Sequence, residues 1–314
     1  MAFEPVVLFF LLGAVAGLLR SDLKIPSSIY DALSIFLLLA IGLKGGVKLA
    51  EHPIGEMVLP GIAIIIAGAL IPLLAFPVLR YFGRMSRPDS ASIAAHYGSV
   101  SVVTFSVGVT FLGQKMESFE GYMIVFLVFL EMPALIIGAL LARYGQGEVR
   151  WGKMLHEVFF GKSIFLLAGG LLIGYIAGPE GIKPLDLLFF DLFKGVLALF
   201  LLEMGLVAAS RMADLRTYGP VLVGFAIVMP LLSAVLGTAL GWMLGLSVGG
   251  TLLLSTLYAS ASYIAAPAAM RIAVPEANPA LSIGASLGVT FPFNIFIGIP
   301  IYYWMATLVS TTGA

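Results

Sequence analysis

The chain has 314 residues, no cysteine and little charge. The lack of cysteine excludes disulfides, thiolate metal sites and cysteine nucleophiles. Charged residues make up 11% of the chain, whereas about 25% is usual in soluble domains. The formal net charge is zero, which gives no reason to expect nucleic-acid binding. With 60% hydrophobic residues and a mean hydropathy of +1.07, the composition indicates an integral membrane protein in contact with lipid.

Long apolar runs are abundant. Runs that can cross about 30 Å of hydrocarbon, or nearly so, occur at 5–19, 29–49, 57–79, 91–113, 120–142, 163–178, 187–209, 218–246, 250–270 and 281–309. They predict an all-α integral membrane protein with about ten transmembrane helices. The first run follows Glu4 and has no basic segment before it, so we expect a retained span rather than a cleaved signal peptide.

The second half of the chain repeats features of the first. The run Tyr97-Gly98-Ser99-Val100-Ser101 returns as Tyr258-Ala259-Ser260-Ala261-Ser262. Other pairs share an offset of about 160 positions: Pro72-Leu73-Leu74 with Pro230-Leu231-Leu232, Gly42-Leu43 with Gly205-Leu206, and Pro133 with Pro292. We therefore predict one five-helix repeat at 1–142, a connection at 143–162 and a second five-helix repeat at 163–314. Five crossings per copy make this a 5+5 inverted repeat.

The distribution of basic residues predicts the orientation. If both termini lie on one side, the connections on the opposite side contain twelve of the 17 Lys and Arg residues. By the positive-inside rule, both termini face outward and the 143–162 connection is cytoplasmic.

The fourth and ninth runs are predicted to be discontinuous helices. Their repeated segments are rich in small and hydroxyl side chains, and a broken helix persists in a bilayer only where protein or a water-filled cavity satisfies its backbone. The N-terminus of a half-helix can hold an anion without a lysine. Small-residue runs also allow close helix packing, which is the alternative interpretation. The anion-binding hypothesis names Gly98, Ser99, Ser101, Ser260 and Ser262.

A cation site is the second hypothesis. Glu131 lies in mid-span, close to Pro133, and an acid there is expensive unless it is paired or faces a cavity. It is an ion ligand or proton acceptor, or else a protonated or hydrogen-bonded glutamate that locks two helices. Thr290 and Asn294 flank Pro292 at the related positions. With Thr104, these oxygens form the predicted Na⁺ site, and no other metal is expected.

Three further charged or titratable features were considered. Asp191 and Lys194 have the i,i+3 spacing that predicts mutual neutralisation. Lys44 could attract an anion, but a lysine near a helix end more often extends to the membrane surface. His96 adjoins the first break, where proton transfer is conceivable, but a packing donor is the more common role.

These segments resemble the sodium-dependent bicarbonate transporter family of SbtA type over nearly the whole chain. The resemblance is carried by Ile41-Gly42-Leu43-Lys44-Gly45-Gly46, Gly98-Ser99-Val100-Ser101 with Thr104, Met132-Pro133-Ala134-Leu135, and the run from Arg271 through Pro292 to Ile299-Pro300. It implies a core domain that moves against a gate domain, a homotrimer, and Na⁺-coupled bicarbonate import across a bacterial inner membrane. No cofactor is implied beyond Na⁺ as the coupling ion.

The chain departs from the family in three places. Ser260-Ala261-Ser262-Tyr263 replaces a Ser-Ser-Ser-Asp run, Glu131 stands where Asp is familiar, and Lys44 replaces Thr. The missing acid bears on the Na⁺ site. A longer cytoplasmic connection in the family often binds a PII-like regulatory protein, and the resemblance carries over this partner even though 143–162 is short.

The leading interpretation is a secondary active transporter that imports bicarbonate with Na⁺. The alternatives are an Na⁺- or H⁺-coupled transporter of another small anion or organic carboxylate, a passive anion channel, and a receptor for a cytoplasmic regulator. An enzyme is not expected, because the sequence offers no metal-binding His pair and no nucleophile with its base. The duplicated break favours transport.

Overall fold

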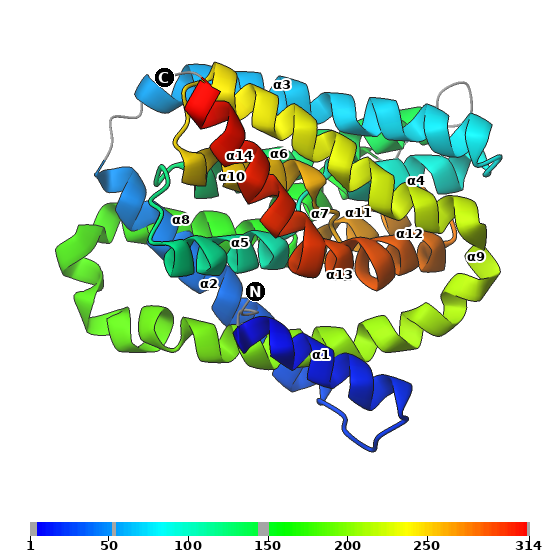
Figure 1. Ribbon diagram of the computed structural model, residues 1–314, viewed down its shortest axis with the longest axis horizontal. Coiled ribbons are helices and arrows are strands. Elements are labelled where there is room, and N and C mark those ends of the chain that lie inside the picture. Colours follow the sequence, from blue (N-terminus) through cyan, green and yellow to red (C-terminus); the bar gives the residue numbers. More distant parts are fainter. Residues whose placement is uncertain (1–4, 52–54, 144–150, 313–314) are drawn as a thin grey trace.

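A computed structural model of the chain describes residues 5–51, 55–143 and 151–312 (Figure 1). These residues form helices and connecting turns, with no strand among them, which confirms the all-α expectation. Eight helical segments in this part are long and apolar enough to cross a membrane. Of the two shorter apolar helices, Pro5–Leu18 matches the predicted span 5–19, whereas Val248–Ala259 covers only the first half of the predicted span 250–270.

The first half contains α1 to α6. Their bounds are α1 Pro5–Leu18, α2 Ser27–Ala50, α3 Gly55–Pro77 with the π turn η1 Val78–Phe82, α4 Arg87–Gly98, α5 Val102–Lys115 and α6 Met123–Arg143. The connection after α6 contains a ten-residue helix, α7 (Trp151–Phe160). The earlier part of that connection, 144–150, lies outside the described residues.

The second half begins with α8 and ends with α14. It consists of α8 Lys162–Ile182, η2 Lys183–Leu185, η3 Leu187–Asp191, α9 Phe193–Met243, α10 Val248–Ala259, α11 Ala265–Ala273, α12 Pro279–Ala285, η4 Ser286–Thr290, α13 Phe291–Phe293, η5 Asn294–Gly298 and α14 Ile299–Thr312. The long α9 contains two predicted spans, because Gly219 adopts a φ of 75° and bends the helix there. Only glycine reaches such a φ without strain.

Glycines bring helices of the two halves into close contact. A Cβ added to Gly46 of α2 would overlap Leu171 O of α8, and one added to Gly174 of α8 would overlap Leu43 O. In the same way, Gly13 of α1 lies against Leu202 O of α9, and Gly205 lies against Phe10 O of α1. We call α1, α2, α8 and the part of α9 up to Ser210 the four-helix group. Its crossed pairing supports the inverted repeat, which remains a prediction.

The remaining spans form a second unit, the core group. In it α3 and α6 pack against α4, and the second part of α9 packs against α10 and α14. Gly98 lies against Pro72 of α3 and Ala134 of α6, while Gly237 of α9 lies against Ser255 of α10. Figure 1 shows this group above α1 and the first part of α9. Both broken helices belong to it.

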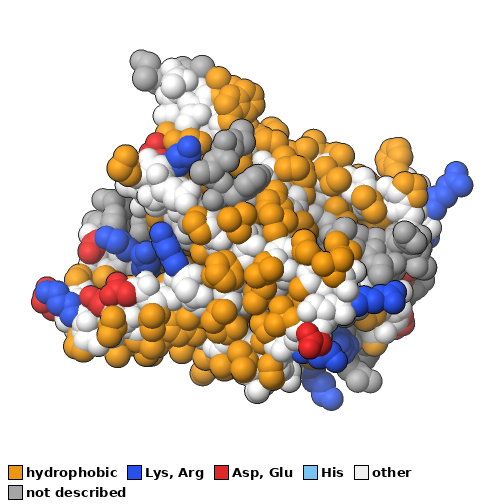
Figure 2. All heavy atoms as spheres, turned by 60° about the horizontal axis from the view of Figure 1, so that its bottom comes forward, with side chains coloured by type: hydrophobic (Ala, Val, Ile, Leu, Met, Phe, Trp, Pro, Cys, Tyr) orange, Lys and Arg blue, Asp and Glu red, His pale blue; other side chains and the backbone are white. Residues whose placement is uncertain are grey.

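The surface is that of a membrane protein. Apolar side chains cover the middle of the face seen in Figure 2, and most of the visible charged groups lie toward its two ends. Large apolar side chains are exposed along the spans, among them Leu59 at 74%, Ile176 at 75% and Trp304 at 62%. Lipid favours such side chains because it is as apolar as they are.

One predicted contact is wrong. Asp191 and Lys194 form no salt bridge within the described part of the chain. Asp191 ends the π turn η3, a bend at Leu192 follows, and Lys194 belongs to the next helix. The i,i+3 spacing brings side chains together only within one regular helix, so the pair does not meet.

Candidate functional site

The fourth predicted span is broken where the sequence indicated. Helix α4 ends at Gly98, Ser99 is extended with φ −85° and ψ 168°, and α5 begins at Val102. Ser101 is the N-cap of α5, and its Oγ accepts a hydrogen bond from Thr104 N at 3.2 Å. A serine oxygen in this position satisfies one of the free N–H groups that open a helix.

The ninth span is broken in the same way. Helix α10 ends at Ala259, Ser260 is extended with φ −80° and ψ 165°, and α11 begins at Ala265. Ser262 Oγ accepts a hydrogen bond from Ala266 N at 3.2 Å. Pro267 fits within the first turn of α11, where a missing N–H leaves no helical bond unmade.

The two breaks contact each other directly. Ser101 N donates to Ser260 Oγ at 2.9 Å, and Ser262 N donates to His96 O at 2.8 Å. Ser260 Oγ in turn donates to Leu257 O at 2.7 Å. Each extended segment therefore bonds to the segment at the other break, or to the helix end before it. We call this arrangement the crossing.

Several donors at the crossing remain available. Within the described residues, no hydrogen-bond partner is found for the N–H of Val102 or Val103 in the first turn of α5. Ser99 Oγ is completely buried and also lacks a partner. Unsatisfied N–H groups and the positive end of a helix dipole attract an anion. The start of α5 is therefore suited to bind a small anion.

Gly98 has a packing role. A Cβ at this position would come within 2.5 Å of Pro72 Cδ and 2.8 Å of Ala134 Cβ. Real Cβ atoms do not approach so closely, so only glycine lets the end of α4 lie against both α3 and α6. This packing fixes where the break begins, and the part of Gly98 in anion binding stays a prediction.

Thr290 and Asn294 reach the breaks through neighbouring residues. Thr290 gives its hydroxyl proton to Ala226 O at 2.6 Å, so Tyr97 donates to Thr290 Oγ1, also at 2.6 Å. Asn294 Nδ2 donates to Ala259 O at 2.9 Å, and its Oδ1 accepts from Tyr302 at 2.7 Å. Tyr97 and Ala259 each come just before a break. These contacts hold the last span against both broken helices.

The last span carries these two residues on π turns. Thr290 closes η4 and Asn294 opens η5, with Pro292 between them. Proline removes a helical N–H and disturbs the regular ladder, and π turns often occur at functional sites. The sequence indicated the proline but not the wider turns around it.

Glu131 is buried on α6 and has an unpartnered oxygen. Its side chain is 1% exposed, and within the described residues Oε2 makes no hydrogen bond. Ala134, about one turn further along α6, lies against Gly98. A buried carboxylate oxygen with no donor is suited to a proton or a cation. This favours the ion-ligand interpretation of Glu131 over the hydrogen-bonded lock.

The tyrosines of the repeated segments were the main omission of the sequence analysis. Tyr97 binds Thr290, and the matching Tyr258 donates to Ile64 O of α3 at 2.6 Å. Both rings are buried. Because buried tyrosine hydroxyls require a partner, the recurrence of Tyr before each Ser-x-Ser was a usable signal. His96, in contrast, donates from Nδ1 to Ser92 O at 2.7 Å, as expected of a packing donor.

A cavity of about 260 Å³ lies beside the second break. It is bordered by the starts of α2 and α8 on one side and by Tyr263 and α11 on the other. Lys162 and Asp31, which also border it, form an ion pair at 2.6 Å. Tyr263 packs edge-on against Phe291 at 5.4 Å between ring centres.

The nine predicted site residues are buried. The four serines meet at the crossing, Thr104 bonds to one of them, and Gly98, Thr290 and Asn294 adjoin the breaks as described above. Within the described residues, no three His, Cys, Asp or Glu side chains gather as a metal site would require. Hydroxyl and carbonyl oxygens are what the breaks offer to a cation, and Na⁺ accepts such ligands. Glu131 lies on α6 about one turn from Ala134, the residue that contacts Gly98.

Comparison with known proteins agrees with this geometry. No curated protein matches the chain. The family model described as the Na⁺-dependent bicarbonate transporter superfamily matches residues 5–307, which is nearly the whole sequence. That family comprises transport proteins rather than enzymes. The chain is thus a multi-pass membrane transport protein, and it belongs to the Na⁺-dependent bicarbonate transporter superfamily.

Proposed function

We propose that the protein imports bicarbonate together with Na⁺ across a bacterial inner membrane. The observation that carries this proposal is the crossing, where Ser101 N bonds to Ser260 Oγ and Ser262 N bonds to His96 O. Two broken helices that meet inside a membrane create a polar site in an apolar surrounding. Family membership supports bicarbonate as the anion and Na⁺ as the coupling ion.

The anion site in this proposal uses hydroxyl protons and backbone N–H groups. Ser101 and Ser262 accept bonds through Oγ, so each hydroxyl still has a proton to donate to a ligand. For Ser101 the ligand competes with the neighbouring Tyr263 hydroxyl. Ser99 has no partner at all within the described residues. Ser260 differs, because its proton is given to Leu257 O. Ser99, Ser101 and Ser262 are therefore the binding serines, whereas Ser260 maintains the crossing.

The cation site in this proposal uses Glu131, Thr104, Thr290 and Asn294. Glu131 Oε2 lacks a partner. Thr290 Oγ1 and Asn294 Oδ1 each accept one hydrogen bond and retain a second lone pair. Tyr263 offers no carboxylate where the family pattern has an acid, so Glu131 supplies the negative charge. Placing Na⁺ beside the anion lowers the electrostatic penalty of burying either ion alone.

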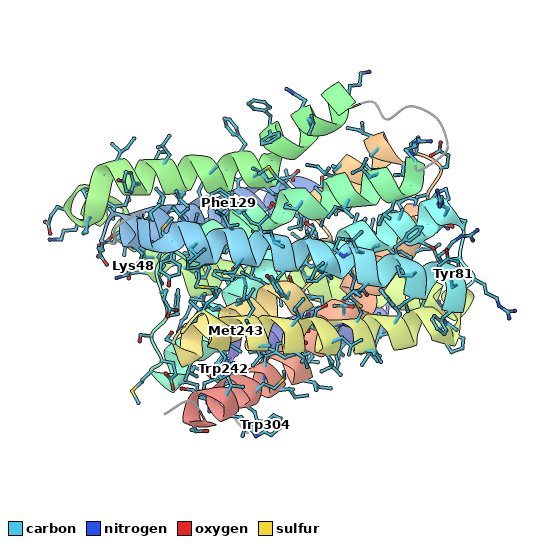
Figure 3. The ribbon with its side chains drawn as sticks, turned by 90° about the horizontal axis from the view of Figure 1, so that it is seen from above. Lys48, Tyr81, Phe129, Trp242, Met243 and Trp304 are labelled. Carbon is cyan, nitrogen blue, oxygen red and sulfur yellow. The ribbon has the colours of Figure 1, made fainter. Side chains whose placement is uncertain are left out.

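Both termini face outward in this proposal, and the cavity beside Tyr263 opens to the cytoplasm. The cytoplasmic assignment follows from the positive-inside rule. In Figure 3 Lys48 and Trp242 lie toward one end of the molecule and Tyr81 toward the other. The four-helix group and the core group meet at this cavity, so movement of one against the other would expose the crossing to either side.

Uptake by purified protein in liposomes tests the proposal. We expect an inward Na⁺ gradient to accelerate uptake of labelled bicarbonate, because Na⁺ and the anion bind together at the crossing. Replacing external Na⁺ with K⁺ should remove the stimulation. The rate should saturate with bicarbonate, since a binding site and not an open pore limits it.

Each alternative gives a different result in the same assay. Flux that ignores the Na⁺ gradient and does not saturate would identify a passive channel. Stimulation by a proton gradient in the absence of Na⁺ would identify proton coupling. Competition by an unlabelled organic carboxylate, stronger than that by unlabelled bicarbonate, would reassign the substrate. Any of these results would overturn the proposal in its present form.

A further inference from the structure

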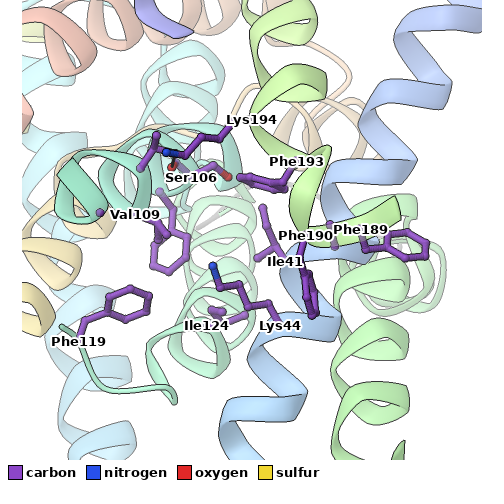
Figure 4. A pocket seen from close by; sticks show the side chains of 14 residues that line it. Ile41, Lys44, Ser106, Val109, Phe119, Ile124, Phe189, Phe190, Phe193 and Lys194 are labelled. Atoms are coloured by element: carbon purple, nitrogen blue, oxygen red, sulfur yellow. Dashed lines mark hydrogen bonds between the residues drawn. The ribbon is translucent and has the colours of Figure 1, made fainter. Parts of the chain in front are cut away.

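A second polar feature lies away from the crossing, in a cavity of about 170 Å³. The cavity lies between α2 and the start of α9 on one side and α5 with the start of α6 on the other. Its walls are largely aromatic and aliphatic, yet Lys44 of α2 and Lys194 of α9 both border it. Figure 4 shows the two side chains extending into this space from different helices.

Neither lysine has an acidic partner among the residues that the structure describes. No Asp or Glu borders the cavity, and neither Lys44 nor Lys194 forms a salt bridge within the described part of the chain. Lys48, one turn from Lys44, is different because it pairs with Glu51 at 2.9 Å. Two ammonium groups facing an apolar space without a counter-ion produce a strongly positive local potential.

The hydroxyls in the same wall do not supply further donors. Ser106 donates to Val102 O at 2.7 Å and Thr110 donates to Ser106 O at 2.9 Å, both within α5. Their protons are committed to the helix backbone. Any anion in the cavity would therefore be bound by the two lysines, and a substitution of these lysines tests the site directly.

Lys44 is held in this position by its glycine neighbours. Gly42 and Gly46 pack against the backbone of α8, and Gly45 packs against Ile124 of α6. The helix is therefore fixed on two sides, and the exposed side chain of Lys44 borders the cavity.

The cavity follows α5 toward the crossing. It borders α5 from Gly113 near the C-terminal end to Phe105, about one turn after the first residue of the helix. The free N–H groups of Val102 and Val103 open that same helix. An anion bound by the lysines would thus lie beside α5, the helix whose N-terminus is at the crossing.

We propose that Lys44 and Lys194 form an outer site that captures small monovalent anions before they reach the crossing. The identification of the captured ion as the transported one, and of the side as external, rests on the proposed function. The binding of a small anion to the lysines does not. The two parts are therefore tested by separate measurements.

The transport measurement compares Lys44→Gln, Lys194→Gln and the double variant with wild type. Each lysine offers a charge-assisted hydrogen bond, so each single change should raise the KM for bicarbonate about three- to tenfold while kcat stays within about twofold. Lys48→Gln is the matched control, with the same change of charge on the same helix at a lysine that is already paired. The KM of Lys44→Arg should stay close to that of wild type, because arginine keeps the positive charge.

The binding measurement uses detergent-solubilised protein without Na⁺. Bicarbonate should raise the Tm of wild type relative to gluconate at equal ionic strength, because gluconate is too large for the cavity. The rise should be lost in the double variant and kept in Lys48→Gln. Size-exclusion profiles establish that each variant is folded.

The outcomes separate the two proposals. If bicarbonate uptake by wild type ignores Na⁺ but the lysine-dependent rise in Tm is present, the transport proposal fails and the anion site stands. If uptake depends on Na⁺ but the lysine variants keep the wild-type KM and Tm response, the outer site is refuted. A loss of kcat at unchanged KM, or an equal effect in Lys48→Gln, also refutes it.

Discussion

At the scale of single residues, the serines of the crossing differ in whether their side-chain hydroxyl has a hydrogen-bond partner within the protein. Ser260 donates to Leu257 O and accepts from Ser101 N, so it is satisfied by the protein itself. Ser99 is equally buried but has no partner within the described residues. A buried hydroxyl without a partner is unfavourable for stability. A ligand that uses it would explain why it is there.

This difference predicts opposite consequences for two similar substitutions. Ser99→Ala should leave thermal stability unchanged or slightly higher, because no bond is lost, but should reduce Na⁺-driven bicarbonate uptake at least about tenfold. Ser260→Ala should lower the free energy of unfolding by about 1–3 kcal/mol, because Ser101 N loses its partner. Thermal unfolding and uptake are measured on the same preparations.

Ser286→Ala is the matched control. Ser286 is also buried, and its hydroxyl donates to Ser282 O within the last span rather than at a break. The Ser286→Ala variant should keep a rate of bicarbonate uptake close to that of wild type. Full activity of Ser99→Ala would show that the unpartnered hydroxyl does not bind the substrate.

At the scale of helices, glycines determine how closely the spans approach. The contacts of Gly46 with Leu171 O and of Gly174 with Leu43 O join α2 to α8 across the two halves. In a membrane, such close packing replaces the hydrophobic effect as the force that associates helices. The pairing also fixes α2 so that Lys44 borders the outer cavity.

Two glycines of α8 allow a controlled test of this packing. Gly174→Ala places a methyl group against Leu43 O and should lower the free energy of unfolding by about 1–3 kcal/mol through overpacking. Gly169→Ala meets no atom within 4 Å and should be neutral or stabilising, because alanine has the higher helix propensity. Thermal unfolding in detergent measures both.

If the two variants were equally stable, the close contact between α2 and α8 would contribute little to the free energy of unfolding. The same pair of variants also tests the outer site. If Gly174→Ala shifts α2, it should raise the KM for bicarbonate as well, because Lys44 moves with the helix.

At the scale of the whole molecule, the two ends differ in charge. The predicted cytoplasmic connections carry most of the Lys and Arg residues. Two of these basic residues form ion pairs between segments that are distant in the sequence. Arg143 pairs with Glu276 at 2.8 Å, and Lys162 pairs with Asp31 at 2.6 Å. This asymmetry predicts the orientation of the chain, with both termini outside.

The absence of cysteine makes the orientation easy to measure. Lys183→Cys and Lys24→Cys each introduce a single thiol at an exposed position, one at each end of the molecule. A membrane-impermeant maleimide should label Lys183→Cys in intact cells, because η2 lies outside in the proposed orientation. Lys24→Cys should react only after permeabilisation.

The reverse labelling pattern would show the opposite orientation in the membrane. The two-lysine cavity would then lie on the cytoplasmic side. The homotrimer and the PII-like partner that the resemblance implies remain predictions. Cross-linking and size-exclusion measurements on the purified protein address the first, and a pull-down with segment 143–162 addresses the second.

The sequence alone determined the class of the protein, the ten apolar runs and the position of both breaks. It did so because apolar length and the loss of helix-forming residues are local properties of the chain. The repeated Ser-x-Ser also indicated which residues meet. The resemblance to the transporter family is likewise carried by short segments of the sequence.

Only the tertiary structure decided which hydroxyls are free, because that depends on partners far away in the chain. Ser99 and Ser260 look alike in the sequence, yet only Ser260 is bonded to the opposite break. Lys194 was expected to meet Asp191, but the bend at Leu192 parts them and Lys194 borders the same cavity as Lys44. Contacts between distant segments depend on how helices pack, and local spacing does not contain that information.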